Sequence, residues 1–422
     1  LSRRQRQMCI RDSTDGSSRL AAGNQWAFFP SGGVAWRISE EEFFGKREWL
    51  NSLKLRASYG AVGNSAIDPY QTIAGLSKYD YLFGEDAGNK FFAYRPSMIP
   101  NKDLGWEISR TANFGVDFGL WNNRISGYIE GYITKTSDLL MERTLPFFTG
   151  FSKVWQNIGK TENKGIELNI QANTLKTKSF SWETTVTFAR NWNKITELLG
   201  GGDIRNNSWF IGKPLQVHYN YEMIGVWQLG EEKEAQKYGA IPGDIKVKDQ
   251  NNDGSIGELD KVILGQKDPK IIASLLNSFR FGAFDASINL NMNFGSLIHP
   301  NTYASLITRD GLRWMPSNFK YWTPDNPTNE YTRADKLSGY DPFAGTGGYM
   351  KGDYIKIQDI TLGYDFSKIM PKNWKILRAR LYAQVRNLGY IYKACKNDVS
   401  PEAPDFDYNI PTTYTMGINI DF

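Results

Sequence analysis

The chain has 422 residues with 50 basic and 45 acidic side chains, and its net charge of +5 is too small to indicate a nucleic-acid partner. Two Cys and two His exclude a disulfide framework and argue against a histidine-based zinc site. Aromatic residues reach 14%, yet the mean hydropathy is −0.47, and no apolar run approaches the roughly 18 residues of a membrane-spanning helix.

The first 13 residues are predicted to lie outside the folded part. They are basic, show no clear alternation and lack the apolar centre of a signal peptide. They are similar to translated cloning sequence, and a disordered leader is the alternative. The folded domain is therefore expected over residues 14–422, and we expect the chain to lack N-terminal sequence of its parent protein.

From residue 25 onward, apolar and polar residues alternate with period two over long stretches. Runs of about 10–12 residues are twice the usual strand length of soluble proteins, and at about 45° tilt they rise roughly 25 Å, the height of the apolar band of a membrane β-barrel. We predict an all-β, antiparallel transmembrane barrel segment of about eleven strands, with room for two more in 192–271. The clearest strands lie in 52–59, 111–120, 165–172, 284–294, 377–387 and 412–422.

The predicted connections alternate strictly between short and long. Membrane barrels place short turns on the periplasmic side and long loops outside the cell. Helices are predicted only within two of the connections, at 39–50 and 231–239. The short connections are 119–124, 174–179, 281–284 and 365–374, and the long ones are 62–108, 135–162, 192–271, 295–352 and 388–410.

The stretch "DQNNDGSIGELD" (Asp249–Asp260) has nearly the residue pattern of an EF-hand calcium loop, with a Gly at position six. The flanking residues are not helical, and Asp260 stands where a Glu is usual, so the alternative is a metal-free Asp/Asn/Gly turn. A structural Ca²⁺ ion on the extracellular side is the metal prediction. Its expected ligands are the side chains of Asp249, Asn251, Asp253 and Asp260 and the backbone carbonyl of Ser255.

Aromatic residues in the long connections offer flat apolar faces for sugar rings. The candidates are Trp209, Trp314 and Trp322, and packing within the loops is the alternative. Charged residues of the polar strand faces are expected to solvate the lumen or contact a plug. The chain contains no GxSxG, HExxH or P-loop motif, so the sequence supports neither an enzyme nor an organic cofactor.

Several segments resemble SusC-like, TonB-dependent outer-membrane transporters of the starch-utilisation type. They include "WLNSLKLRASYGAVGN", "LPFFTGFSKVWQNIGKTENKGIELNI" and "PGDIKVKDQNNDGSIGELDKVILG", and the resemblance runs from about Trp26 to Phe422. It implies a barrel of about 22 strands in the outer membrane of a Gram-negative bacterium, closed by an N-terminal plug. This chain corresponds to the C-terminal part of that barrel, without the plug or the TonB box.

The resemblance also implies partners. It implies uptake of large nutrients, oligosaccharides or peptides, with a SusD-like surface lipoprotein as a lid and the TonB complex acting through the missing N-terminal part. Phe422 ends an alternating strand and is predicted to be the signal for the barrel-assembly machinery, which would capture an apolar edge strand. The alternatives are a passive porin and a soluble all-β carbohydrate-binding or adhesin protein.

Overall fold

The computed structural model describes residues 6–45, 47–82, 90–308, 319–333, 343, 345–367, 369–371, 376–396, 399–404 and 410–421. Strands dominate this part of the chain. No helix within the described ranges is long and apolar enough to cross a membrane.

The principal element is one sheet in which neighbouring strands follow one another in chain order, apart from hairpins inserted in the connections. Its strands are 9 to 18 residues long, as period two predicts. Twelve strands are found in it among the described residues: β1 (Arg6–Gly16), β2 (Trp26–Arg37), β3 (Leu50–Asn64), β6 (Glu107–Leu120), β7 (Ile125–Ser137), β10 (Lys160–Lys176), β11 (Phe180–Glu197), β16 (Ile271–Phe281), β17 (Phe284–Phe294), β20 (Tyr354–Asp365), β21 (Arg378–Lys393) and β22 (Thr413–Asp421).

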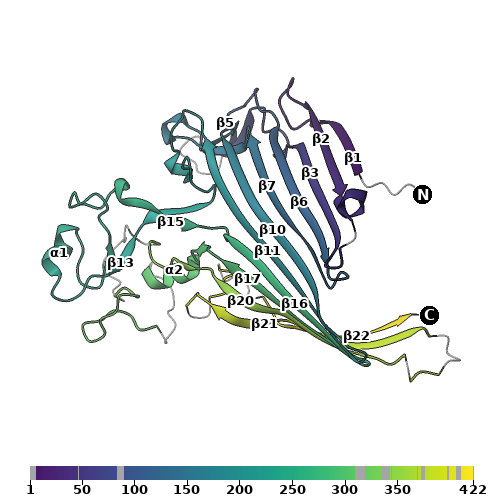
Figure 1. Ribbon diagram of the computed structural model, residues 1–422. Helices are drawn as coiled ribbons and strands as arrows, with labels where there is room; N and C mark the ends of the chain where they lie inside the picture. The colour runs from purple at the N-terminus through teal and green to yellow at the C-terminus, as the bar shows by residue number, and fades with distance from the viewer. Residues whose placement is uncertain are drawn as a thin grey trace. The chain divides into compact units, whose positions relative to one another are not determined.

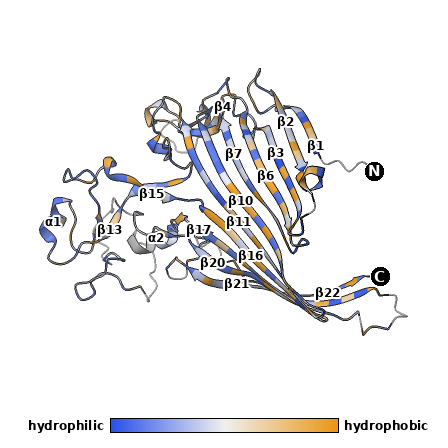
Figure 2. Cartoon of the chain, viewed as in Figure 1, coloured by the Kyte–Doolittle hydropathy of each residue, from blue (hydrophilic) through white to orange (hydrophobic). Residues whose placement is uncertain are grey.

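The register of these strands separates an apolar face from a polar face. Leu290 lies opposite Leu275, and Ile288 lies opposite Ile360, whereas Asn289 between them pairs with Asp359 on the other face. Figure 2 shows the result as alternating bands of hydrophobic and hydrophilic residues along the long strands. The predicted faces of β17 are therefore confirmed.

The disordered alternative for residues 1–13 is wrong from Arg6 onward, and the non-native origin of this segment stays a prediction. Arg6–Gly16 form β1, which pairs antiparallel with β2 over its whole length. Met8 and Ile10 lie opposite Val34 and Gly32 and continue the apolar face, a short alternation that the polar residues after Ile10 obscure in the sequence. Strand pairing supplies the backbone hydrogen bonds of this segment even where its side chains alternate poorly.

The chain divides into two compact units, Leu1–Gln171 with Ala189–Leu215 and Ala172–Phe188 with Gln216–Phe422. In unit 1, the long connections hold the hairpins β4–β5 and β8–β9, which Figure 1 places at one end of the strands, opposite the short turn 121–124. The elements of these and the neighbouring connections are η1 (Ile38–Glu40), η2 (Glu42–Phe44), β4 (Gly75–Leu82), β5 (Lys90–Met98), β8 (Leu140–Thr144), η3 (Phe147–Thr149), β9 (Lys153–Asn157) and η4 (Arg205–Asn207).

Unit 2 repeats this organisation. Its long connections form three small two-stranded sheets and two short helices at one end of β16, β17, β20 and β21, with the short turns at the other end (Figure 1). The elements are β12 (Val217–Tyr221), β13 (Met223–Val226), α1 (Glu232–Lys237), β14 (Ile245–Val247), η5 (Glu258–Asp260), β15 (Lys261–Gln266), β18 (Leu297–Ile298), α2 (Asn301–Thr308) and β19 (Met350–Lys351).

The alternation of short and long connections is confirmed, and the details of two segments are corrected. The segment 39–50 forms two 3-10 turns rather than a helix, whereas the helix within 231–239 is present as α1. The strands within 192–271 pair with one another, β12 with β15 and β13 with β14, and do not join the long sheet.

Candidate functional site

The polar face of β3, β6 and β7 carries a cluster of ion pairs. Arg56 donates from Nε to Asp117 at 2.9 Å, and its Nη2 lies 3.1 Å from Glu130. Lys54 adds a second cation to Asp117 at 3.2 Å. Gly115 stands between Arg56 and Glu130 in the register, and a Cβ there would lie 2.9 Å from the guanidinium. The missing side chain therefore lets Arg56 reach across a whole strand.

Unit 2 contains a similar cross-strand ion pair beside a glycine. Arg380 on β21 forms two hydrogen bonds to Asp285 on β17, at 2.9 and 2.5 Å, across the intervening strand β20. Gly363 is the residue of β20 that lies directly opposite Asp285, and a Cβ there would collide with both partners at 2.6 Å. In both units, a glycine on the middle strand allows a charge-assisted pair that compensates the charges of the polar face.

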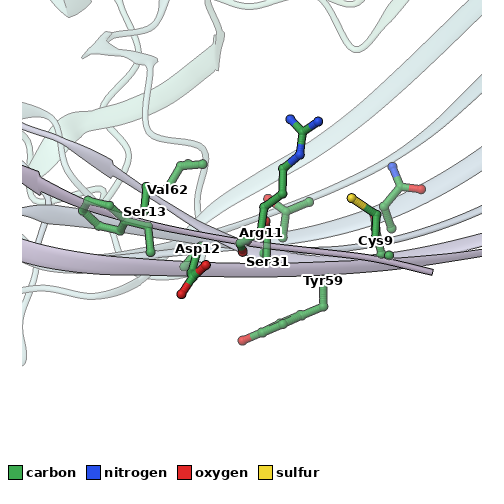
Figure 3. A pocket seen from close by; sticks show the side chains of 15 residues that line it. Cys9, Arg11, Asp12, Ser13, Ser31, Tyr59 and Val62 are labelled. Atoms are coloured by element: carbon green, nitrogen blue, oxygen red, sulfur yellow. Dashed lines mark hydrogen bonds between the residues drawn. The ribbon is translucent and has the colours of Figure 1, made fainter.

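Farther along β17 from Asp285, the polar face is lined by amides. Asn289, Asn291 and Asn293 on β17 donate to Asp359, Gln358 and Tyr354 at 3.2, 3.4 and 2.9 Å. Figure 3 shows the same separation of faces in unit 1, where Arg11 and Cys9 project to one side of the strands and Tyr59 to the other. The surface is rich in hydrogen-bonding groups, and the charged pairs described above balance one another.

One cation of the polar face is buried. The side chain of Lys356 on β20 is only 4% exposed and lies 2.6 Å from Glu402. Tyr390 donates to the same carboxylate at 2.8 Å and lies 3.0 Å from the Ser400 hydroxyl. Glu402 belongs to the connection between β21 and β22, so this network holds that connection against the polar face. An unpaired charge at this depth would be costly.

Two further long connections interlock in unit 2. Trp322 donates its indole N–H to Gln228 at 2.9 Å, and Gln228 donates to the Thr328 carbonyl at 3.1 Å. Arg333 donates to Asp244 at 2.8 Å. The segments 216–270 and 319–333 of unit 2 thus pack against each other at the long-connection end of the unit.

Two of the three predicted aromatic residues, Trp209 and Trp322, lie in the part of the chain that the structure describes. Trp322 is 6% exposed, so the prediction that its ring stacks on a sugar is wrong: packing within the connections covers it. Trp209 is half-buried and packs against the cluster of Ile158, Ile195 and Leu198. Trp314 lies outside the described residues, as does Phe422, and the assembly signal stays a prediction.

The segment Asp249–Asp260 is closed by its own hydrogen bonds. Asp249 accepts from the backbone N–H groups of Asn252 and Gly254, at 2.6 and 2.9 Å. The buried Asp260 accepts from those of Gln250 and Gly257, both at 2.8 Å. Asn252 and Gly254 have φ of 59° and 83°, left-handed conformations that Asn and Gly tolerate best.

The predicted ligands Asn251 and Asp253 also form hydrogen bonds within the loop. Asp253 accepts from both the backbone N–H and the hydroxyl of Ser255 at 2.8 Å, and Asn251 donates to Asp253 at 2.8 Å. No group of three or more His, Cys, Asp or Glu side chains converges on a metal position in the described part of the chain. The calcium ion therefore stays a prediction, and the hydrogen bonds alone account for the turn.

Both histidines lie in one aromatic cluster of the long connections. The ring of Tyr349 lies 5.1 Å from that of His218 and 4.2 Å from that of His299. Each histidine donates from Nε2 to a backbone carbonyl, His218 to Leu297 at 2.9 Å and His299 to Gly347 at 3.1 Å. Burial lowers the pKa of His218 to about 4, so its ring is neutral at physiological pH.

Sequence reasoning located the charged positions of the strands but missed their partners. Asp117 and Arg380 are among the charged strand residues that were expected to solvate the lumen or contact a plug, and both lie on the polar face. The Lys356–Glu402 pair was missed because Glu402 lies in a connection without periodicity. A glycine at a polar-face position of an alternating strand, as at Gly115 and Gly363, is a signal in the sequence that was available for the cross-strand pairs.

Long strands with one apolar and one polar face, short turns at one end and packed connections at the other define the wall of an outer-membrane β-barrel. The chain belongs to the family described as TonB dependent receptor-like, beta-barrel, whose model matches residues 10–388. This is a family of receptors and transporters in the outer membrane of Gram-negative bacteria, and the soluble alternative is therefore wrong.

Relatives cover nearly the whole chain. TonB-dependent receptor P26 of Formosa agariphila is 30% identical over 97% of the chain, and TonB-dependent receptor SusC of Bacteroides thetaiotaomicron is 29% identical over 97%. The structure of the RagAB peptide transporter superposes with a TM-score of 0.80 at 24% identity over 99% of the chain. The chain spans only 44% of P26, 41% of SusC and 46% of the RagAB chain.

Proposed function

We propose that this chain forms the C-terminal part of the barrel of a SusC-like importer of large polar nutrients, oligosaccharides or peptides. The parent protein is energised by TonB through its N-terminal part and works with a SusD-like surface lipoprotein. The barrel-assembly machinery inserts it, guided by the terminal strand and Phe422. The similarity to SusC and to the RagAB peptide transporter supports this proposal.

The observation that carries the proposal is the chemistry of the polar face. Charged residues of this face are paired, as in Arg56–Asp117 and Arg380–Asp285, and amides such as Asn291 line it farther along β17. A wall of this kind exchanges hydrogen bonds with a hydrated ligand without attracting one sign of charge. Large neutral polar molecules fit it better than apolar or highly charged ones.

Uptake by the full-length protein tests the proposal. Cells that carry it as their transporter for a labelled oligosaccharide or peptide mixture are compared with and without TonB. We expect uptake to require TonB and to remain selective for one of the two ligand classes. Uptake that persists without TonB would instead establish the passive channel.

A matched pair of variants connects uptake to the polar face. Asn291→Trp narrows the lumen, whereas Met292→Trp places the same ring on the apolar face one residue away. We expect slower uptake of the larger ligands for the first variant and unchanged uptake for the second. Co-purification of a surface lipoprotein with the parent protein tests the partner.

A further inference from the structure

The apolar face of unit 2 is hollowed near the short-turn end of its strands. A groove of about 340 Å³ lies there, within the range of small-molecule sites. Its lining includes the aromatic residues Phe281, Phe284 and Tyr364 and the alanines Ala286 and Ala383. The Phe284 and Tyr364 rings meet edge to face at 4.6 Å.

The register explains why the surface is hollow at this position. One row across the strands reads Phe279, Ala286, Leu362, Ala383 and Met416, so small and large side chains alternate. The next row toward the turns is made only of large residues, and it closes the groove at that end. Each of the two alanines lies between larger side chains of this row and leaves a hollow that a row of large residues would fill.

The polar groups at and beside the groove are paired within the chain: Asp285, which also lines the groove, accepts two hydrogen bonds from Arg380 on the polar face. Asn277 lies on the apolar face one pleat further from the turn than Phe279, and it accepts from the Trp182 indole N–H at 2.9 Å and the Thr184 hydroxyl at 2.8 Å. Trp182 also packs against Phe279 with ring centroids 5.8 Å apart. Polar groups that satisfy one another in this way are what a lipid-facing surface requires.

We propose that this groove binds one acyl chain of a phospholipid of the periplasmic leaflet more firmly than the rest of the apolar face binds lipid. The short turns of outer-membrane barrels face the periplasm, which places the groove at the depth of that leaflet's chains. Its walls are open to the surroundings, with Leu362 59% and Met416 78% exposed, and they contact the membrane. The inference uses the family's membrane location and does not depend on the transported ligand.

A phospholipid with a photoreactive diazirine on its acyl chain tests the site in the full-length protein, reconstituted in bilayers of the same phospholipid. After illumination, the adducts are mapped by peptide mass spectrometry. We expect peptides of β16, β17, β20 and β21 to carry about fivefold more adduct than the apolar face of β3 and β6, which corresponds to about 1 kcal/mol. An even distribution of adducts along the barrel would overturn the proposal.

Filling the groove provides the second arm. Ala286→Phe with Ala383→Phe is expected to remove the enrichment, while Ala57→Phe, an alanine of the apolar face in unit 1, leaves it intact. If the double variant still shows adduct enrichment in these peptides, the groove is not the lipid site, even when the wild-type protein shows an uneven distribution of adducts. An acylated lipoprotein probe is tested in the same way. If it labels the same peptides and the phospholipid does not, the groove binds the acyl chain of a protein anchor, and the proposal that the chain comes from a phospholipid is wrong.

Discussion

The strand wall and the long connections are stabilised by different means. Phe114, Ile129 and Met416 on the wall are 54%, 48% and 78% exposed, so its apolar face gains little from packing within the chain. The connections instead contain compact clusters such as Leu20, Ala21, Ile67 and Leu104, each at most 3% exposed. The wall depends on its hydrogen-bond ladder and on lipid, whereas the connections fold like parts of a soluble protein.

This difference decides where a substitution should be felt. Loss of a buried group in a connection should destabilise that connection and leave the ladder intact. A polar group added to the apolar face of the wall should matter only in a bilayer. The four predictions below are ordered by the expected size of the effect.

Removing Glu402 should have the largest effect, because Lys356 would then be buried without a partner. We expect Glu402→Ala to cost about 3–5 kcal/mol. Glu330→Ala is the matched control, since its partner Lys396 is 66% exposed and such a pair contributes about 0–1 kcal/mol. Urea unfolding of the full-length protein, with hydrogen exchange over 394–404, measures both. Similar costs for the two variants would show that the buried pair is not the anchor of its connection.

Leu104→Ala tests the soluble-like character of the connections. Leu104 is 0% exposed, and its truncation should cost about 2–5 kcal/mol. Leu76→Ala, at a position 65% exposed, should cost much less. Hydrogen exchange should increase around residues 20–25, 65–67 and 101–105 while β6 keeps its protection. If β6 loses protection equally, wall and connections are one cooperative unit.

The lipid dependence of the wall is tested by two neighbouring positions of β17. Leu290 lies on the apolar face near the middle of the strand, and Leu290→Arg should cost about 2–4 kcal/mol near the bilayer midplane. Asn289→Arg places the same side chain on the polar face and should cost far less. Folding titrations into lipid vesicles give both values, and equal costs would mean that the faces are exchanged.

The wall was predictable from the sequence because each strand carries its own signal. Period two identifies the face of Ile288, Asn289 and Leu290 without knowledge of any partner strand. The alternating lengths of the connections then give the direction of each strand. Among the described strands of the wall, β1 was not predicted, because the alternation at Met8 and Ile10 is too short to be distinguished from the polar residues that follow.

The connections were not predictable in this way. The Lys356–Glu402 pair joins residues 46 positions apart, and the burial of Trp322 depends on Gln228, 94 positions away. No local sequence pattern encodes such contacts. From the sequence alone, an aromatic residue in a loop is therefore equally consistent with binding a ligand and with packing inside the loop. The calcium-loop pattern was visible because a sharp Asx turn is local, and a metal-free turn uses the same residues.

The smallest expected effect concerns the segment Asp249–Asp260, where a bound ion would add to a turn that its own hydrogen bonds already close. Calcium sites of extracellular modules have dissociation constants of about 10⁻⁴–10⁻³ M. With a constant of about 1 mM, about 10 mM calcium would stabilise the loop by about 1.4 kcal/mol, or roughly tenfold in its opening equilibrium. Intact cells that display the full-length protein are treated with trypsin in calcium or in chelator. The rate of cleavage after Lys246, Lys248 and Lys261 should therefore differ about tenfold between the two conditions.

Asp253→Asn is the matched control, because an amide oxygen still accepts from Ser255 while one charged ligand is lost. We expect the variant to be cleaved at the chelator rate under both conditions. Equal cleavage of the wild-type loop with and without calcium would leave only the hydrogen-bonded turn, and a loop that trypsin cannot reach under either condition would contradict its placement outside the cell.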